Sequence, residues 1–207
     1  MKTALRLDER RTGGSLLRNM DWILASASPR RKELFAELVE KFEILPAKGE
    51  EKIGAGLTPA QLVKALAMQK AEEVAALPIA EGKFVLGADT VVALGNEVLG
   101  KPKDEEDAKR MLTALSGRSH DVYTGVCIVY VDEMGARKTK VEAARTEVVF
   151  EDLSKEQIDK YVASGSPMDK AGAYGIQDGG LVKEIKGSYS NVVGLPMELL
   201  ERMMKEI

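Results

Sequence analysis

Two arginines stand at the start of a predicted helix, where cations are least favoured. Residues 24–35 read LASASPRRKELF, in which Ser28 is a good N-cap and Pro29 suits the first helical position. Arg30 and Arg31 therefore fall in the first turn, where the helix dipole already places positive charge. The arrangement becomes favourable if a multiply charged anion binds over this turn, because guanidinium and backbone N–H groups then donate to it together.

A carboxylate interrupts the most apolar predicted strand. Residues 84–94 read FVLGADTVVAL, with Asp89 and Thr90 near the middle. Burying a carboxylate is costly unless a cation or strong hydrogen-bond donors meet it. We therefore interpret Asp89 as a metal ligand or a general base, and a structural carboxylate at a strand irregularity beside Gly87 is the alternative.

Candidate lysines and acidic residues accompany these positions. The segment GNEVLGKP (95–102) matches most of a phosphate loop, but Pro102 stands where Ser or Thr would bind magnesium, so we reject a P-loop. Lys101 is either a phosphate-binding lysine delivered by a hairpin or a solvated surface lysine. Lys70 in a predicted helix and Glu51 in a predicted loop would, by default, be solvated.

A glycine-dense segment lies further along the chain. Residues 166–180 read SPMDKAGAYGIQDGG and contain Asp169, Lys170 and Gln177. Dense glycine suggests that the backbone approaches a ligand closely, and a tight structural loop is the alternative. Together with the arginines, the strand carboxylate and the lysines, this inventory suits a polyphosphate and a divalent cation.

Composition limits the function classes. The 207 residues are 44% hydrophobic and 30% charged, which is typical of a globular protein, and no apolar run is long enough to span a membrane. The net charge of −3 argues against a protein that coats nucleic acid, so any anion site must come from local clusters. The single cysteine, Cys127, predicts a reducing, cytoplasmic setting. We interpret Cys127 and the single histidine, His120, as structural, since neither completes a metal cluster or a catalytic triad.

Turn and capping residues predict interleaved helices and strands after a loosely attached extension at residues 1–20. Predicted strands lie at 22–26, 42–45, 84–94, 97–100, 119–132 and 138–152, followed by a β-rich stretch at 174–193. Predicted helices begin at 29 and 196 and span 58–77, 104–117 and 154–164. Several strands are hairpin neighbours, which favours a mixed α/β sheet over a doubly wound parallel one. The length suits one core, as a single domain over 21–207 or as two closely joined lobes.

Four segments resemble the Maf family of nucleoside triphosphate pyrophosphatases, over about residues 21–205 in one register. They are ASASPRRKELF, VLGADTVV, GKPKDEEDAKRMLTALSGRSHDVYTGV and YVASGSPMDKAGAYGIQ…GSYSNVVGLP. The resemblance implies a fold related to the inosine triphosphate pyrophosphatases, with a mixed sheet between two lobes, flanking helices and frequent homodimerisation. It also implies cleavage of a nucleoside triphosphate between the α and β phosphates with Mg²⁺ or Mn²⁺, which limits misincorporation into nucleic acids.

The resemblance assigns roles to single residues. Asp89 matches the catalytic residue and, with Glu51, the metal ligands. The positions that bind phosphate match Ser26, Arg31, Lys70 and Lys101. The branch that acts on dTTP and UTP carries the residue types found here at Arg30, Thr90 and Gln177, so these two nucleotides, and modified pyrimidine nucleotides as a further class, are the implied substrates.

Two other classes of function are weighed against this one. The first is a nucleotide-binding regulator of septum formation and division arrest without important turnover. The second is a nucleic-acid-binding protein that uses Arg30 and Arg31, which the net charge of −3 and the lack of a basic stripe oppose. The sequence leaves open whether Asp89 acts as a base or mainly as a metal ligand.

Overall fold

The computed structural model describes residues 20–50 and 56–207, and in this part of the chain one seven-stranded sheet organises the fold. Its order is β2-β1-β3-β5-β6-β7, with β4 paired to the end of β3. The strands are β1 (Trp22–Leu24), β2 (Glu43–Ile44), β3 (Phe84–Leu94), β4 (Glu97–Leu99), β5 (Ser119–Val131), β6 (Arg137–Phe150) and β7 (Val182–Lys186). Strand β1 pairs in parallel with β2 and β3, and the other pairs are antiparallel. The predicted mixed sheet is confirmed.

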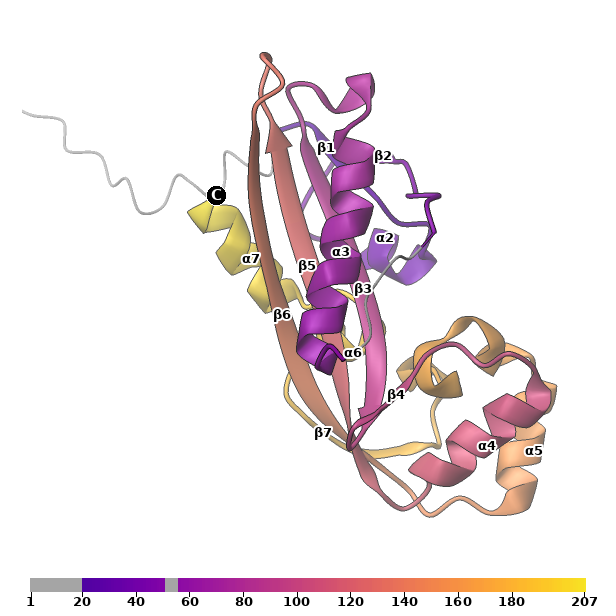
Figure 1. Ribbon diagram of the computed structural model, residues 1–207. Helices are drawn as coiled ribbons and strands as arrows, with labels where there is room; N and C mark the ends of the chain where they lie inside the picture. Colours follow the sequence, from indigo (N-terminus) through magenta and orange to yellow (C-terminus); the bar gives the residue numbers. More distant parts are fainter. Residues whose placement is uncertain (1–19, 51–55) are drawn as a thin grey trace, which may run out of the picture.

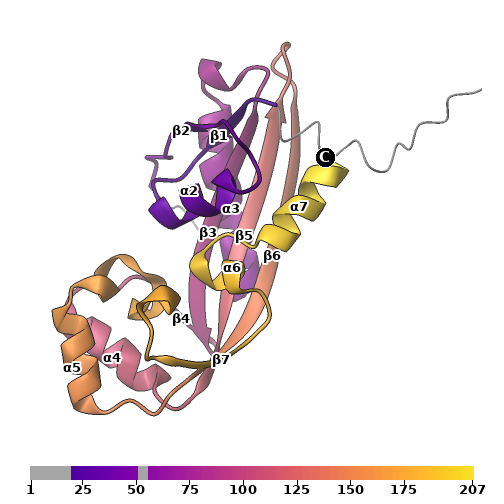
Figure 2. The same cartoon turned by 180° about the vertical axis from the view of Figure 1, so that it is seen from behind.

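Helices cover both faces of the sheet and build a second lobe at one end (Figure 1). They are α2 (Pro29–Ala36), α3 (Pro59–Ala75), α4 (Glu105–Leu115), α5 (Lys155–Ala163), α6 (Tyr189–Val193) and α7 (Met197–Glu206). Helix α3 lies on one face, and α2, α6 and α7 lie on the other, which Figure 2 shows from behind. Helices α4 and α5 lie side by side in the second lobe, beyond the hairpin of β3 and β4.

Local capping signals begin the helices where the sequence predicts. The hydroxyl of Ser28 accepts a hydrogen bond from the backbone N–H of Arg31 at 3.5 Å, so both arginines occupy the first turn of α2. Helix α3 opens with a capping box: the Thr58 hydroxyl accepts from the Gln61 N–H at 3.3 Å, and the Gln61 side chain accepts from the Thr58 N–H at 3.0 Å.

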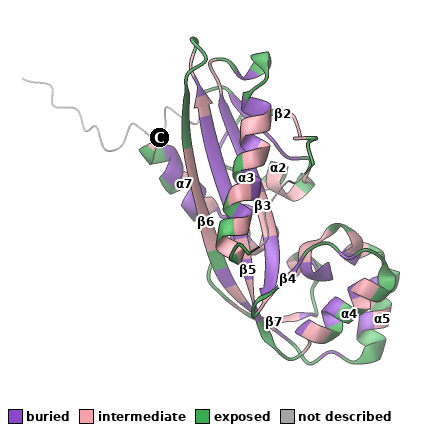
Figure 3. Ribbon diagram, viewed as in Figure 1, coloured by how far each residue is buried: buried purple, intermediate pink, exposed green. Residues whose placement is uncertain are grey.

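Strands β3 and β5 carry apolar side chains on both faces and are buried over most of their length (Figure 3). One cluster, between the sheet and helices α2 and α7, contains Trp22, Phe35 and Leu200. A second cluster lies under α3 and contains Cys127, which is fully buried. Burial raises the pKa of the Cys127 thiol to about 12, which agrees with a structural role.

Helix α3 crosses the sheet at two glycines, Gly87 on β3 and Gly125 on β5. A Cβ atom on Gly87 would lie 2.4 Å from the carbonyl oxygen of Ala67, and one on Gly125 would lie 2.1 Å from that of Val63. These separations are shorter than any Cβ contact tolerates, so only glycine lets the helix backbone pack directly on the strands. The approach sets the height of α3 above β3 and β5.

We expect Gly125→Ala to destabilise the protein by about 3 kcal/mol, because the added methyl group meets helix backbone that cannot yield as a side chain would. Gly100→Ala is the matched control, since nothing lies within 4 Å of a Cβ at that position. Urea denaturation of both variants measures the difference. Equal stabilities for the two variants would contradict the packing argument.

The second lobe has its own core, where β5 and β6 meet α4 and α5. His120 lies in it, only 3% exposed, with Nε2 2.8 Å from the Tyr174 hydroxyl and its ring edge-on to Phe150. No described residue hydrogen-bonds its Nδ1. Burial lowers the pKa of His120 to about 4, so the imidazole is neutral and structural, as predicted.

This histidine makes stability depend on pH. The unfolded chain protonates His120 below pH 6.5 and the folded chain only below about pH 4, so stability is full above 6.5 and is lost as the pH falls through this window. The shift corresponds to roughly 3 kcal/mol. We expect urea titrations between pH 7 and 4 to show the loss, and His120→Gln to remove most of the slope. An unchanged slope in the variant would assign the acid lability to other groups.

One predicted element is wrong over most of its length. Of the β-rich stretch expected at 174–193, only β7 is a strand, and the stretch ends as helix α6. Gly179 adopts a left-handed φ of 72°, which turns the chain before β7. Ser188 then accepts a hydrogen bond from the Asn191 N–H at 3.2 Å and begins α6.

Two other sequence-based expectations concern the chain termini and membranes. The predicted extension at 1–20 lies outside the described residues, apart from Met20. Within residues 20–50 and 56–207, no helix combines the length and the apolarity that crossing a bilayer requires.

Candidate active site between the lobes

A cavity of about 590 Å³ lies between the two lobes, and a second of about 430 Å³ adjoins it. Both are lined by the same group of mostly charged residues, namely Ser28, Arg30, Arg31, Lys70, Lys101 and Asp169. The larger cavity also reaches Asp89, Thr90 and Gln177, and the smaller one reaches Ser26. The structure thus brings together every predicted site residue that it describes. Glu51 lies outside the described residues.

Asp89 faces helix α3, because alternate side chains of β3 point to opposite faces of the sheet. Its Oδ1 lies 2.5 Å from Nζ of Lys70, and the two side chains are 13% and 23% exposed. Among the described residues, no further hydrogen bond or ion pair engages Oδ2 of Asp89. The cation that a half-buried strand carboxylate needs is therefore Lys70, which the sequence alone would leave in solvent.

Arg31 is held by neutral oxygens. Its Nε donates to the carbonyl oxygen of Gly194 at 2.9 Å. Its Nη2 donates to the Thr90 hydroxyl at 3.1 Å, and its Nη1 donates to the Ser26 hydroxyl at 3.3 Å. Burial lowers the pKa of Arg31, and the charge of Asp89 offsets this only in part. None of the described carboxylates forms an ion pair with Arg31, so the oriented guanidinium retains charge for an anion.

Thr90 lies on the opposite face of β3 from Asp89 and supports Arg31. Its hydroxyl is 3.0 Å from that of Thr124, which donates to the carbonyl oxygen of Asn191 at 2.9 Å. The side-chain amide of Asn191 in turn donates to the carbonyl oxygen of Val122 at 3.0 Å. This buried chain fixes α6, and with it the Gly194 carbonyl, against the sheet. Sequence reasoning missed Asn191 and Gly194, because a backbone acceptor leaves no mark in a residue pattern.

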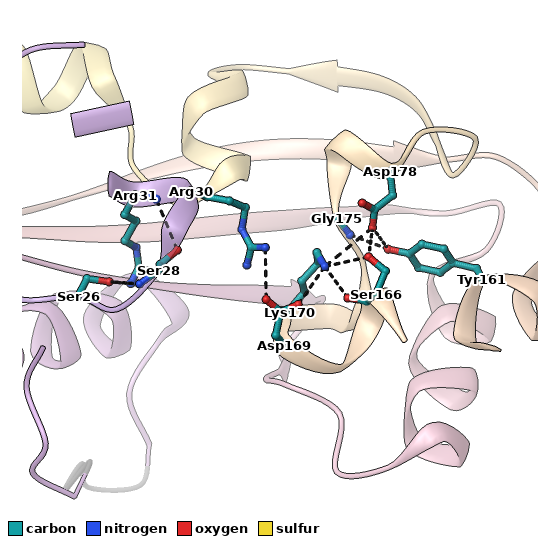
Figure 4. A network of polar contacts seen from close by, with 10 residues as sticks. All are labelled: Ser26, Ser28, Arg30, Arg31, Tyr161, Ser166, Asp169, Lys170, Gly175 and Asp178. Atoms are coloured by element: carbon teal, nitrogen blue, oxygen red, sulfur yellow. Dashed lines mark hydrogen bonds and ion pairs between the residues drawn. The ribbon is translucent and has the colours of Figure 1, made fainter. Parts of the chain in front are cut away.

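Arg30 points across the cavity toward the second lobe (Figure 4). Its Nη1 lies 3.4 Å from Oδ2 of Asp169, in a pair whose carboxylate is 62% exposed. An exposed pair at this distance contributes little stability and can exchange its partner for a ligand. Lys101, at the end of the β3–β4 hairpin, and Gln177, in the second lobe, are both exposed at the cavity margin.

The described residues do not form a metal site by themselves. Among them, no group of three or more His, Cys, Asp and Glu side chains lies close enough to hold an ion. Of the two predicted metal ligands, the structure describes Asp89. The other, Glu51, lies outside the described residues.

A family model described as Maf-like protein matches residues 21–207 of this sequence. The chain belongs to the Maf family. A relative from Agathobacter rectalis, named dTTP/UTP pyrophosphatase, is 48% identical over 198 residues, covering 89% of this chain and 96% of the relative. A protein of the same name from Bacillus cytotoxicus is 49% identical over 187 residues, covering 89% and 94%.

Solved structures confirm the predicted fold class of this Maf chain. The HAM1 protein of Coxiella burnetii matches 91% of the chain and 100% of its own length with a TM-score of 0.52 at 17% identity. The Staphylococcus aureus Ham1 protein matches 90% and 98% with a TM-score of 0.51 at 16% identity. At these identities the likeness concerns the fold alone.

Proposed function

We propose that this protein hydrolyses dTTP and UTP to the nucleoside monophosphate and pyrophosphate. The proposal rests on one observation: the Asp89–Lys70 pair lines the same cavity as the two arginines of α2 and Lys101. Gln177 lies at the opposite margin of that cavity. The name dTTP/UTP pyrophosphatase, borne by relatives at 48% and 49% identity, supports the choice of substrates.

In this proposal the triphosphate occupies the region common to both cavities. Arg30, Arg31, Lys70 and Lys101 line that region, and their fixed positive charges suit a polyanion. The base lies toward Gln177, whose amide offers both a donor and an acceptor. The substrate therefore spans the two lobes, with its phosphates on the first and its base against the second.

Asp89 has the central chemical role. Lys70 fixes Oδ1, so the carboxylate orients the attacking water and accepts its proton through Oδ2. The water oxygen bonds to the α-phosphorus while the bond from that phosphorus to the bridging oxygen breaks, and its electron pair leaves with pyrophosphate. Arg31 and Lys101 meet the charge that develops on the leaving group.

A divalent cation, Mg²⁺ or Mn²⁺, belongs to the proposal. Magnesium is usually held by one or two carboxylates together with substrate phosphates and waters. Among the described residues no group is recorded on Oδ2 of Asp89, so this oxygen would hold the ion in the alternative in which Asp89 is a metal ligand and not the base, and Glu51 would supply a second carboxylate. When bound, the ion neutralises phosphate charge and polarises the phosphoryl oxygen.

The proposal also includes a cytoplasmic location and a homodimer, without a nucleic-acid or membrane partner. The single, buried cysteine supports the location, since a thiol persists in a reducing compartment. The net charge of −3 supports the absence of a nucleic-acid partner, and the family resemblance of the sequence supports the dimer.

Asp89→Asn tests the mechanism. We expect turnover to fall by roughly 10²–10³ while the protein still folds, since the side chains are nearly isosteric and the amide oxygen can still accept a hydrogen bond from Lys70. Asp121→Asn is the matched control: Asp121 lies on the neighbouring strand β5 and pairs with Arg145 at 2.9 Å, away from the cavity. Retention of more than about a tenth of wild-type turnover by Asp89→Asn would refute the role.

The substrate assignment predicts pyrophosphate, not orthophosphate, as the first product, and higher kcat/KM for dTTP and UTP than for CTP and GTP. Gln177 can match the O4 and N3–H edge of uracil or thymine, whereas cytosine presents an amino group there. Because Gln177 is exposed, we expect a preference of roughly tenfold to a hundredfold, below the limit of an enclosed site. Gln177→Glu should reduce it. Equal kcat/KM for UTP and GTP would rule out this base site.

A further inference from the structure

The turn that carries Gln177 is tied at both sides to one hydroxyl group. The 3-10 turn Ile176–Asp178 places Gln177 at its centre. The Tyr161 hydroxyl, from helix α5, accepts a hydrogen bond from the backbone N–H of Gly175 at 2.9 Å and donates to Oδ2 of Asp178 at 2.5 Å. The residues two before and one after Gln177 therefore share a single anchor, which Figure 4 shows.

A second donor completes the anchor. The Ser166 hydroxyl donates to the same Oδ2 of Asp178 at 2.7 Å. The ammonium of Lys170 bonds the Ser166 carbonyl oxygen at 2.5 Å and the Asp169 carboxylate at 2.9 Å. With Arg30 on the other side of Asp169, the contacts form one chain from α5 in the second lobe to α2 in the first (Figure 4).

The protonation states suit this arrangement at neutral pH. Burial and the hydrogen bond to Asp178 raise the pKa of Tyr161, so its phenol remains a donor. Although burial opposes it, the hydrogen bonds from Tyr161 and Ser166 hold the pKa of Asp178 below its ordinary value, so the carboxylate remains an acceptor. The anchor is thus a charge-assisted pair of hydrogen bonds, stronger than neutral ones.

Gln177 itself has no comparable support. Its side chain is exposed and, among the residues that the structure describes, neither donates nor accepts a hydrogen bond. Its position relative to a base therefore depends on the backbone of the turn. We propose that Tyr161 is a positioning residue for base selectivity, which holds the Gln177 turn at the height where its amide meets the pyrimidine edge. This inference rests on the proposed function.

Tyr161→Phe tests the inference, since it removes only the hydroxyl. The ratio of kcat/KM for UTP to that for CTP should fall by roughly tenfold, about the effect of one lost hydrogen bond. Hydrogen exchange of the Gly175 amide, followed by NMR in the nucleotide-free protein, should accelerate, because its acceptor is gone. This exchange rate measures the loss of the hydrogen bond between Gly175 and Tyr161 independently of catalytic turnover.

Ser154→Ala is the matched control. Ser154 caps the same helix, α5, through a 3.2 Å hydrogen bond from the Gln157 N–H, so its loss weakens the helix without touching the turn. We expect a lower melting temperature with the wild-type ratio of UTP to CTP. An equal fall of the ratio in this variant would overturn the inference, because general weakening of the lobe would then explain it.

A wild-type ratio in folded Tyr161→Phe would overturn the positioning role and leave the proposed function standing. Wild-type protein that cleaves UTP and CTP equally would instead refute the base site itself, and the inference with it. If Tyr161→Phe does not fold, Ser166→Ala removes the other hydroxyl donor to Asp178. It should lower the ratio in the same direction by a smaller factor, and an unchanged ratio there would overturn the inference.

Discussion

The close contact between helix α3 and the central strands is the constraint on which the site depends. A carboxylate on an apolar strand and an ammonium on a helix facing that strand are each unfavourable alone. Gly87 and Gly125 admit the helix backbone against the sheet, and at that height Lys70 reaches Asp89 at 2.5 Å. The packing of small residues therefore determines the electrostatics of the cavity.

The surroundings of the two arginines of α2 also determine how each of them can act. Arg31 receives its geometry from uncharged oxygens on three other parts of the chain, including the Gly194 carbonyl, and keeps its charge. Arg30 has only a long, exposed contact with Asp169. One arginine is thus fixed before any ligand arrives, and the other is able to change partners. Such a division suits a substrate whose phosphates must first be attracted and then held in one orientation.

Local features of the fold could be predicted from the sequence, because they depend on a few neighbouring residues. The N-cap at Ser28, the capping box at Thr58 and the β3–β4 hairpin all lie where the sequence indicates. The stretch 174–193 could not be predicted, since its apolar content resembles strands while Gly179 and Ser188 impose a turn and a helix. Short apolar runs remain ambiguous when periodicity is the main guide.

The candidate site divides in the same way. Residue types alone identified Asp89, Arg30 and Arg31 as candidate site residues, because a carboxylate in an apolar strand and cations at a helix start are both unfavourable without a ligand or partner. Lys70 gained a role only through the resemblance of the whole chain to a family, and the structure then placed it beside Asp89. Tyr161 carried no signal: its hydroxyl acts on a turn fourteen residues away along the chain, a distance that only the folded lobe closes.

Strands β5 and β6, which run for 13 and 14 residues, pass without interruption from one lobe to the other. Their ladder of hydrogen bonds is continuous from the Ser119–Val149 pair to the Val131–Arg137 pair, so the two strands form one paired ribbon. Bending such a paired ribbon strains hydrogen bonds along its whole length, so the ribbon is a stiff support for both lobes. Because the second lobe packs on the ends of β5 and β6, this ribbon keeps the distance between the arginines of α2 and the turn that carries Gln177 nearly constant, and a ligand that fills the cavity must match that distance.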